Sequence, residues 1–174
     1  MTYLGTNLTP DEYYANLSKT YFNPHQDAVF DLIDRMVPEY PAANILDLGC
    51  GPGLATQIIQ QRNSGCTFVG MDSSEEMVRR YEDERKCTGI LGTFWSEYPK
   101  VDVIIAAHCL HLCPDERLYQ TMTCMIQSGA VRLFITSPNK HTVEKFDFPV
   151  MFYRQARSGE KEKTIHGWCL NLEG

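Results

Sequence analysis

The strongest constraint on the fold is a set of three alternating glycines, Gly49, Gly51 and Gly53, within residues 44–55, NILDLGCGPGLA. Apolar residues with strand character precede the glycines, and a helical pattern begins at Leu54. A strand-to-helix turn uses backbone angles that a Cβ penalises, and a side chain would keep a ligand away from the backbone. The segment therefore predicts a strand, a turn that binds a nucleotide-type cofactor, and a helix.

An acid follows the next predicted strand. The apolar run of residues 67–71 ends at Asp72, nineteen residues after Gly53. An acid in this place typically binds the hydroxyls of a ribose. The glycine spacing is GxGxG, whereas the dinucleotide fingerprint GxGxxG has its third glycine where helix and strand pack around a pyrophosphate. A pyrophosphate ligand is therefore the weaker interpretation.

With these parts in this order, the chain resembles the class I S-adenosylmethionine-dependent methyltransferases. Their first motif is similar to residues 45–53, and their second is similar to residues 68–77, FVGMDSSEEM. The resemblance implies an α/β fold: a doubly wound, mostly parallel, Rossmann-like sheet of seven strands with a C-terminal antiparallel hairpin. It also implies S-adenosyl-L-methionine as cofactor and methyl transfer as activity. A glycine turn that binds nothing, and an intact fold that has lost activity, are the alternatives.

The length of 174 residues fits one domain with a buried core and leaves little room for a second. We expect a single methyltransferase domain over residues 1–174, in which residues 1–38 form an N-terminal helical lid. In relatives, this segment folds over the cofactor. Tyr14 and Tyr21 are therefore candidates to contact the methionine carboxylate, with amphipathic packing as the alternative role.

Composition limits the cellular location, the state of the cysteines and the metal binding that we expect. No apolar stretch approaches the roughly 20 residues that span a bilayer, so no membrane partner is expected. The N-terminus lacks the basic start and apolar core of a signal peptide, which indicates a cytoplasmic protein. Seven cysteines, an odd number, indicate reduced thiols rather than a disulfide framework. Cys109 and Cys113 are the closest pair, but no second pair matches them, so no metal is predicted.

The formal net charge is −6, and basic residues are interleaved with acids. Proteins that bind nucleic acid usually show a basic stripe, so this balance argues against a nucleic-acid partner. A partner subunit could supply positive charge, and a protein partner or a homodimer stays open.

The predicted elements alternate along the chain. Capping and periodicity signals predict helices at residues 10–19, from 24 to the proline at 38, at 54–61, from a capping box of Ser73 and Glu76 to about Lys86, and at 114–126. Strands are expected at residues 45–48, 67–71, 90–91, 101–106 and 131–135, with two more around 158–161. Strands separated by helices predict βαβ units and a parallel sheet.

Ligands of open α/β sheets lie beyond the carboxyl ends of the strands. At the first strand exit, the resemblance assigns Gly49, Cys50 and Gly51 to the methionine part of the cofactor. Cys50 is expected to be a small filler rather than a nucleophile, because neither a basic partner nor a separate base is apparent nearby. Asp47 would orient this loop or contact the cofactor's amino group through water.

At the second exit, Asp72 is expected to bind the ribose, with Ser73 beside it in the cofactor site. Met77 corresponds to a position that often packs against adenine in the family, although a methionine at helical spacing is equally typical of a core. Relatives commonly carry an acid at the third exit, where this chain has Thr93 and Phe94, followed by Trp95. Adenine would then be held by backbone groups, by the threonine hydroxyl or by aromatic contacts, with core packing as the alternative for either ring.

The fourth exit, residues 106–111, resembles the family segment that covers the methionine end and faces the substrate. Ala106 is assigned to the cofactor. His108 and His111 are the catalytic candidates, because histidine titrates near neutrality and could take a proton from a nucleophile. Closing the pocket by hydrogen bonding is the alternative, favoured for His111, whereas His108 is the better base. An activated sulfonium needs mainly an oriented nucleophile, so a base is optional.

The acceptor is the least determined part of the prediction. The chain has no long insertion after its fourth or fifth strand, so we expect a pocket that is open or completed by a partner. A small molecule is the favoured acceptor. The alternatives are a tRNA or protein acceptor, and an inactive S-adenosylmethionine-binding module that regulates a partner. An aminopropyl transferase would need an acidic loop after the fourth strand, where this chain has residues 106–108, AAH.

Overall fold

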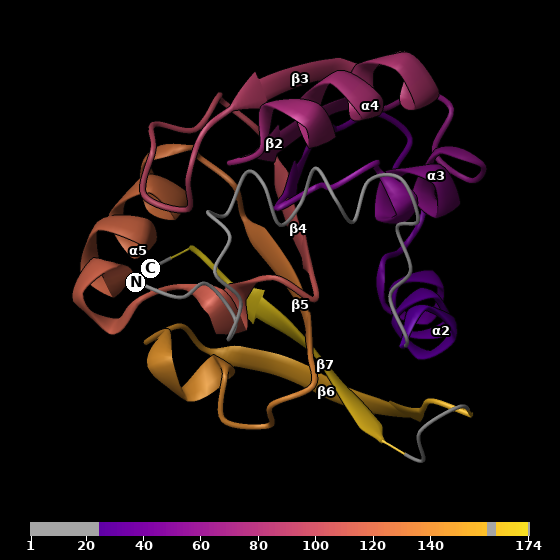
Figure 1. Cartoon of the computed structure of the whole chain (residues 1–174). Coiled ribbons are helices and arrows are strands. Elements are labelled where there is room, and N and C mark those ends of the chain that lie inside the picture. The colour runs from indigo at the N-terminus through magenta and orange to yellow at the C-terminus, as the bar shows by residue number, and fades with distance from the viewer. Residues whose placement is uncertain (1–24, 160–162, 174) are drawn as a thin grey trace, which may run out of the picture.

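The computed structural model describes residues 25–159 and 163–173, and within them a seven-stranded sheet forms the centre (Figure 1). Its strand order is β3-β2-β1-β4-β5-β7-β6. Neighbours from β3 to β5 are parallel, whereas β7 runs antiparallel to both β5 and β6. The predicted doubly wound sheet with a C-terminal antiparallel pair is confirmed.

The bounds of the elements follow the predicted alternation closely. The strands are β1 Asn44–Leu48, β2 Thr67–Asp72, β3 Thr88–Leu91, β4 Val103–Ala107, β5 Arg132–Ser137, β6 Val150–Arg157 and β7 Thr164–Asn171. The α-helices are α2 Gln26–Met36, α3 Leu54–Gln60, α4 Glu75–Arg85 and α5 Leu118–Gln127, and the short 3-10 turns are η1 Leu110–Leu112, η2 Asp115–Arg117 and η3 Val143–Lys145.

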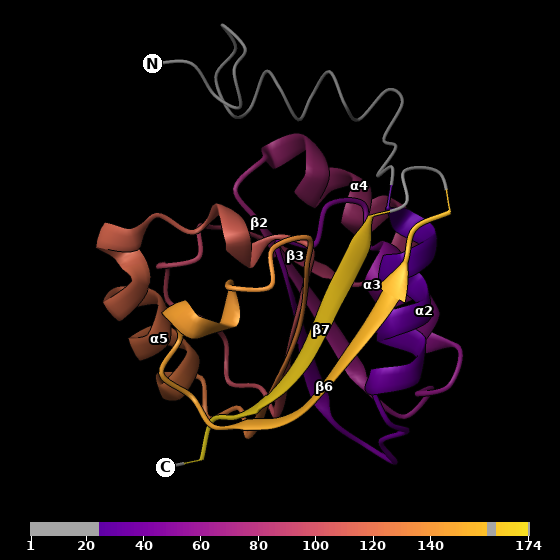
Figure 2. The ribbon, with the colours of Figure 1, turned by 90° about the horizontal axis from the view of Figure 1, so that it is seen from below.

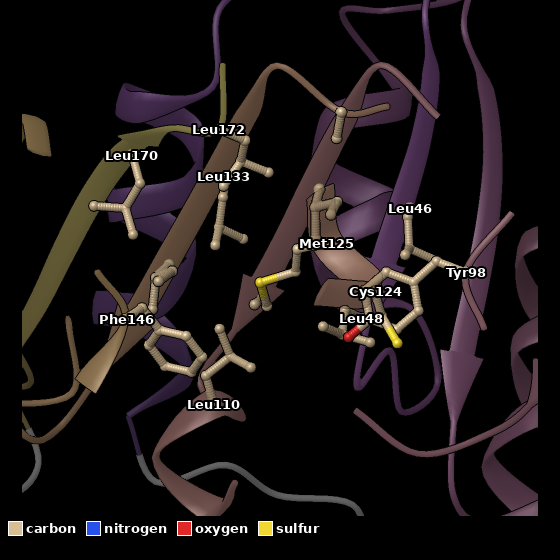
Figure 3. Packing of buried hydrophobic residues seen from close by; sticks show 14 of the residues in the cluster. Leu46, Leu48, Tyr98, Leu110, Cys124, Met125, Leu133, Phe146, Leu170 and Leu172 are labelled. Carbon is tan, nitrogen blue, oxygen red and sulfur yellow. The ribbon is translucent and has the colours of Figure 1, made fainter. Parts of the chain in front are cut away.

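Two apolar clusters cover the two faces of the sheet. Ile45 of β1 packs with α2 and α3, whereas Leu46 and Leu48 belong to the cluster beneath α5, because successive side chains of a strand point to opposite faces. Figure 2 shows α5 on one side of the sheet and α2 with α3 and α4 on the other. Figure 3 shows Leu133 and Met125 among the residues of the α5 cluster. A strand buried on both faces reads as a continuous apolar run, as in β4.

Several predicted boundaries are wrong. The first turn of α4 is capped by Ser74, whose Oγ accepts a hydrogen bond from Met77 N at 3.4 Å, and not by Ser73. The strand predicted from residue 101 begins at Val103, and the helix predicted from residue 114 opens as η2 before α5. The helix α2 begins at Gln26 rather than at residue 24. The predicted helix at 10–19 lies outside the described residues.

Candidate functional site

The glycine loop lies at the carboxyl end of β1, where the strand order reverses between β1 and β4. Gly49, Gly51 and Gly53 have φ angles of +66°, +50° and +79°, in the left-handed region that side chains disfavour. The N–H groups of Gly49 and Cys50 both donate to Met71 O, at 2.7 and 3.1 Å. The loop is therefore fixed to the neighbouring strand β2 by its own backbone.

Neighbouring side chains also press against the loop. A Cβ at Gly49 would lie 2.7 Å from Cys109 Cβ, and one at Gly53 would lie 2.7 Å from Tyr81 Cδ2. Both distances are below any normal carbon contact. Glycine is therefore required here for close packing as well as for its backbone angles.

Asp72 lies beside the glycine loop, as the order of motifs predicts. Its Oδ2 accepts a hydrogen bond from Gly51 N at 2.9 Å, and its Oδ1 accepts one from Ser74 N at 3.0 Å. The carboxylate thus connects the loop after β1 to the start of α4. It is half-buried, so part of it still faces solvent at the carboxyl edge. Ser73, the other predicted cofactor residue of this exit, is exposed.

Asp47 lies beneath the loop, with only 2% of its surface exposed. Its Oδ2 accepts hydrogen bonds from Thr56 Oγ at 2.7 Å and from Thr56 N at 3.3 Å. The Thr56 hydroxyl also lies 3.0 Å from Tyr81 Oη. Burial raises the pKa of Asp47 to about 7, although the Thr56 hydrogen bonds oppose this shift. The buried carboxyl thus connects β1 to α3 and, through Thr56, to α4.

Two further predicted cofactor residues are buried. Cys50 is 7% exposed, and its Sγ would lie 2.8 Å from a Cβ at Gly70, so it fills space between β1 and β2. Burial raises the pKa of the Cys50 thiol, which therefore stays protonated and is a poor nucleophile. Met77 is 1% exposed on α4.

The two aromatic residues of the third exit point to different neighbours. Phe94 Cε1 would lie 3.6 Å from a Cβ at Gly49, so this ring reaches the glycine loop. Trp95 instead lies under the Arg117 guanidinium, 5.4 Å from its ring centroid. The Thr93 hydroxyl is 3.0 Å from Ser96 Oγ, which holds the turn after β3 together. Of the two rings, Phe94 is the one placed against the predicted site.

The fourth exit brings the two predicted histidines together. His108 has a φ of +61°, and its N–H donates to Thr136 O at 2.9 Å, which ties it to β5. The ring centroids of His108 and His111 are 5.2 Å apart, and His25 lies 5.8 Å from His108. Ala106 is fully buried, with its side chain in the α5 cluster.

The pKa of His108 is lowered to about 3, first by burial and then by the charges of His111, His25 and Lys163. Burial and Lys163 lower the pKa of His111 to about 4. Both imidazoles are therefore neutral near pH 7.

Sequence reasoning missed His25. Its place is the residue before α2, and the Asn23-Pro24 pair directed attention to a helix start two residues earlier. No spacing in the sequence links a histidine at a helix boundary to residues far along the chain, so its contact with His108 could not be predicted.

Three further predictions have plain outcomes. Tyr14 and Tyr21 lie outside the described residues. Within residues 25–159 and 163–173, no three histidine, cysteine or acidic side chains are grouped as metal ligands. No helix in that part of the chain combines the length and apolarity needed to cross a bilayer.

Comparisons with known proteins agree with this geometry. A family model described as "Methyltransferase domain" matches residues 45–128, which contain the glycine loop, Asp72 and the histidine segment. Trans-aconitate 2-methyltransferase of Mycolicibacterium gilvum is 36% identical over 98 residues, covering 55% of this chain and 38% of that protein. The chain therefore matches about two-fifths of the length of such relatives.

Solved structures share the fold at low sequence identity. Magnesium protoporphyrin IX methyltransferase of Synechocystis, with bound S-adenosylmethionine, has a TM-score of 0.63 at 16% identity and covers 95% of this chain and 85% of its own. The 1,6-didemethyltoxoflavin-N1-methyltransferase of Burkholderia thailandensis has a TM-score of 0.66 at 12% identity, with coverages of 94% and 90%. Residues 45–128 are therefore similar to a methyltransferase domain, and the described fold is shared with solved S-adenosylmethionine-dependent methyltransferases.

Proposed function

We propose that the protein binds S-adenosyl-L-methionine and transfers its methyl group to a small-molecule acceptor by in-line displacement. One observation carries this proposal: a glycine loop with three positive φ angles is joined to Asp72 at the point where the strand order reverses. A Cβ at Gly49 would collide with Cys109, so glycine lets this loop pack closely against the segment after β4. The cofactor supplies a methyl group that is already activated on a sulfonium.

Residues of the chain would bind the cofactor and orient it for methyl transfer. Gly49, Gly51 and Asp72 would bind the methionine and ribose parts, and Phe94 offers a ring for the adenine. Asp47 stabilises the loop from below through Thr56. These groups act before the chemical step, because an aligned nucleophile and methyl group supply most of the acceleration in such a transfer.

His108 and His111 would face the acceptor. Both are neutral near pH 7, so neither repels a positively charged cofactor. A pKa of about 3 makes His108 a weak base, which favours a hydrogen bond that orients the acceptor over full removal of its proton.

A small acceptor is supported by the substrates in the names of the relatives and fold neighbours, which are trans-aconitate and a toxoflavin precursor. The acidic balance of the chain, with a formal net charge of −6, also argues against a nucleic-acid acceptor. We further propose that residues 1–174 act as one domain with 1–38 as its lid, and that the protein is cytoplasmic, in keeping with seven free cysteines. A protein partner or a homodimer would complete the pocket if the lid does not.

Calorimetric titration with S-adenosylmethionine and S-adenosylhomocysteine tests the proposal. Both should bind, and Asp72→Ala should weaken binding by about 1–3 kcal/mol through lost hydrogen bonds to a diol and a looser Gly51. Asp147→Ala, at an exposed acid on the loop before β6, is the matched control and should bind like the wild type. A folded chain that binds neither ligand would refute the proposal.

The acceptor class needs a second experiment. A labelled methyl donor, incubated with the protein and with metabolite, tRNA or protein extracts, should label a small molecule. Label in tRNA or protein would establish the alternative acceptors. Tight cofactor binding without transfer to any extract would instead identify a regulatory module.

A further inference from the structure

Three histidines from separate segments meet at the carboxyl edge of the sheet. His25 precedes α2, His108 follows β4 and His111 lies in η1. The ring centroid of His108 is 5.8 Å from that of His25 and 5.2 Å from that of His111. The Nδ1 atoms of His108 and His111 are buried, and neither has a hydrogen-bond partner among the described residues. Leaving buried polar atoms unpaired destabilises the folded protein, and a ligand that bonds them here would offset this.

The titratable groups around this cluster are basic side chains. The charged groups that lower the pKa of His108 are His111, His25 and Lys163, the last from the β6–β7 hairpin. Cys109, between the two histidines, is a buried thiol whose pKa is raised, so it contributes no charge. Asp27 on α2 is exposed, and its Oδ2 accepts from Gly159 N at 3.1 Å.

The Nδ1 atoms of His108 and His111 thus lack hydrogen-bond partners among residues 25–159 and 163–173. An anionic group would supply the opposite charge that the described neighbours of His108 do not provide. It would also favour the imidazolium form, because an adjacent opposite charge raises the pKa of an imidazole.

We propose that His25, His108 and His111 bind the anionic group of the methyl acceptor, and that the acceptor binds together with a proton. This inference rests on the proposed function and names the chemical class of its substrate, an organic acid. The proton comes from solvent and is held on an imidazole of the cluster, where it makes a charge-assisted hydrogen bond to the anion. The only covalent change in this step is the transfer of a proton from hydronium to an imidazole nitrogen, which leaves water. Without the anion, burial and the basic neighbours keep the imidazoles neutral.

The cofactor also carries a carboxylate, so the test must separate the two sources. Histidine ring signals of the full chain are followed by NMR against pH, first for the protein alone, then with saturating S-adenosylhomocysteine, and then with trans-aconitate added. We expect His108 and His111 to titrate far below 6.5 in the first two states. Trans-aconitate should raise the pKa of at least one of them by about one unit or more, equivalent to a tenfold affinity change between the protonation states.

Variants identify the histidines that carry the effect. His108→Gln and His25→Gln should each weaken trans-aconitate binding about tenfold or more and reduce the proton uptake seen by calorimetry in buffers of different ionisation enthalpy. His141→Gln is the matched control, because that histidine is exposed and pairs with Glu144 at 2.9 Å. Affinity for S-adenosylhomocysteine shows that each variant is folded.

The outcomes are distinct. The anion site would be refuted if trans-aconitate, succinate and phosphate all leave the histidine pKa values unchanged in a chain that binds S-adenosylhomocysteine. The proposed function would then stay intact. A shift produced by S-adenosylhomocysteine alone would assign the cluster to the cofactor and overturn its assignment to the acceptor. A chain that does not bind S-adenosylhomocysteine would fail the proposed function itself.

Discussion

Replacing Gly49 by alanine separates the two reasons for glycine in the loop. The φ of +66° costs an alanine about 1–2 kcal/mol. A less flexible unfolded chain returns about 0.4–1 kcal/mol of this. The new Cβ would also lie 2.7 Å from Cys109 Cβ and 2.8 Å from Cys109 Sγ, and overpacking of this kind costs about 1–3 kcal/mol. We therefore expect Gly49→Ala to lower the free energy of unfolding by about 1–5 kcal/mol.

Gly129→Ala is the control that isolates the backbone term. Its φ is +83°, but a Cβ there would meet nothing within 4 Å, so only about 1 kcal/mol should be lost. Urea denaturation of both variants measures the difference, with unchanged m-values as the sign that the unfolded state is the same. Gly49→Ala should also weaken S-adenosylhomocysteine binding, whereas Gly129→Ala should not. Equal loss of stability in the two variants would refute close packing against Cys109.

Four further substitutions test the network around the loop. The pKa of Asp47 is about 7 in the folded state against an ordinary value of 3.8, so between these pH values the folded state holds a proton that the unfolded state has lost. The free energy of unfolding should therefore fall as pH rises from about 4 to about 7, and then level off. Asp47→Asn should remove that fall, which amounts to as much as about 4 kcal/mol, as measured by urea denaturation at several pH values; parallel curves for the two proteins would contradict it. Ser74→Ala should lower the free energy of unfolding by about 1 kcal/mol and Ser73→Ala should leave it almost unchanged, since only Ser74 caps α4. A larger loss in Ser73→Ala would instead support Ser73 as the cap. Tyr81→Phe should lower the free energy of unfolding by about 1 kcal/mol, because it removes the hydrogen bond to Thr56. An unchanged free energy in urea denaturation would contradict this.

The order of strands and helices was accessible from sequence because each signal is local. A glycine turn, an apolar run of strand length and an acid at its end are all read within ten residues, and chain connectivity then fixes a parallel sheet. The meeting of Gly51 and Asp72 also follows, because the carboxyl ends of parallel neighbours share one edge.

Details that depend on a single backbone angle were less accessible. Ser73 and Ser74 both precede acidic residues, and the sequence does not say which one leaves the extended conformation first. In the structure, Asp72 Oδ1 accepts the Ser74 N–H, which leaves the Ser74 side chain directed at Met77 N. The cap is thus set by a local hydrogen bond from Ser74 N to the side chain of Asp72, two residues earlier, and the nearer serine, Ser73, stays exposed.

The third exit, where this chain lacks the acid that is common in relatives, lies close to Asp72. Gly92 N donates to Asp72 O at 2.9 Å, so a residue just after Gly92 lies close to the Asp72 backbone. The charge of Asp72 already contributes to the raised pKa of buried Asp47. A third carboxylate beside them would add like-charge repulsion in a partly buried place. Phe94 instead reaches the glycine loop with an uncharged ring, which adds no such repulsion.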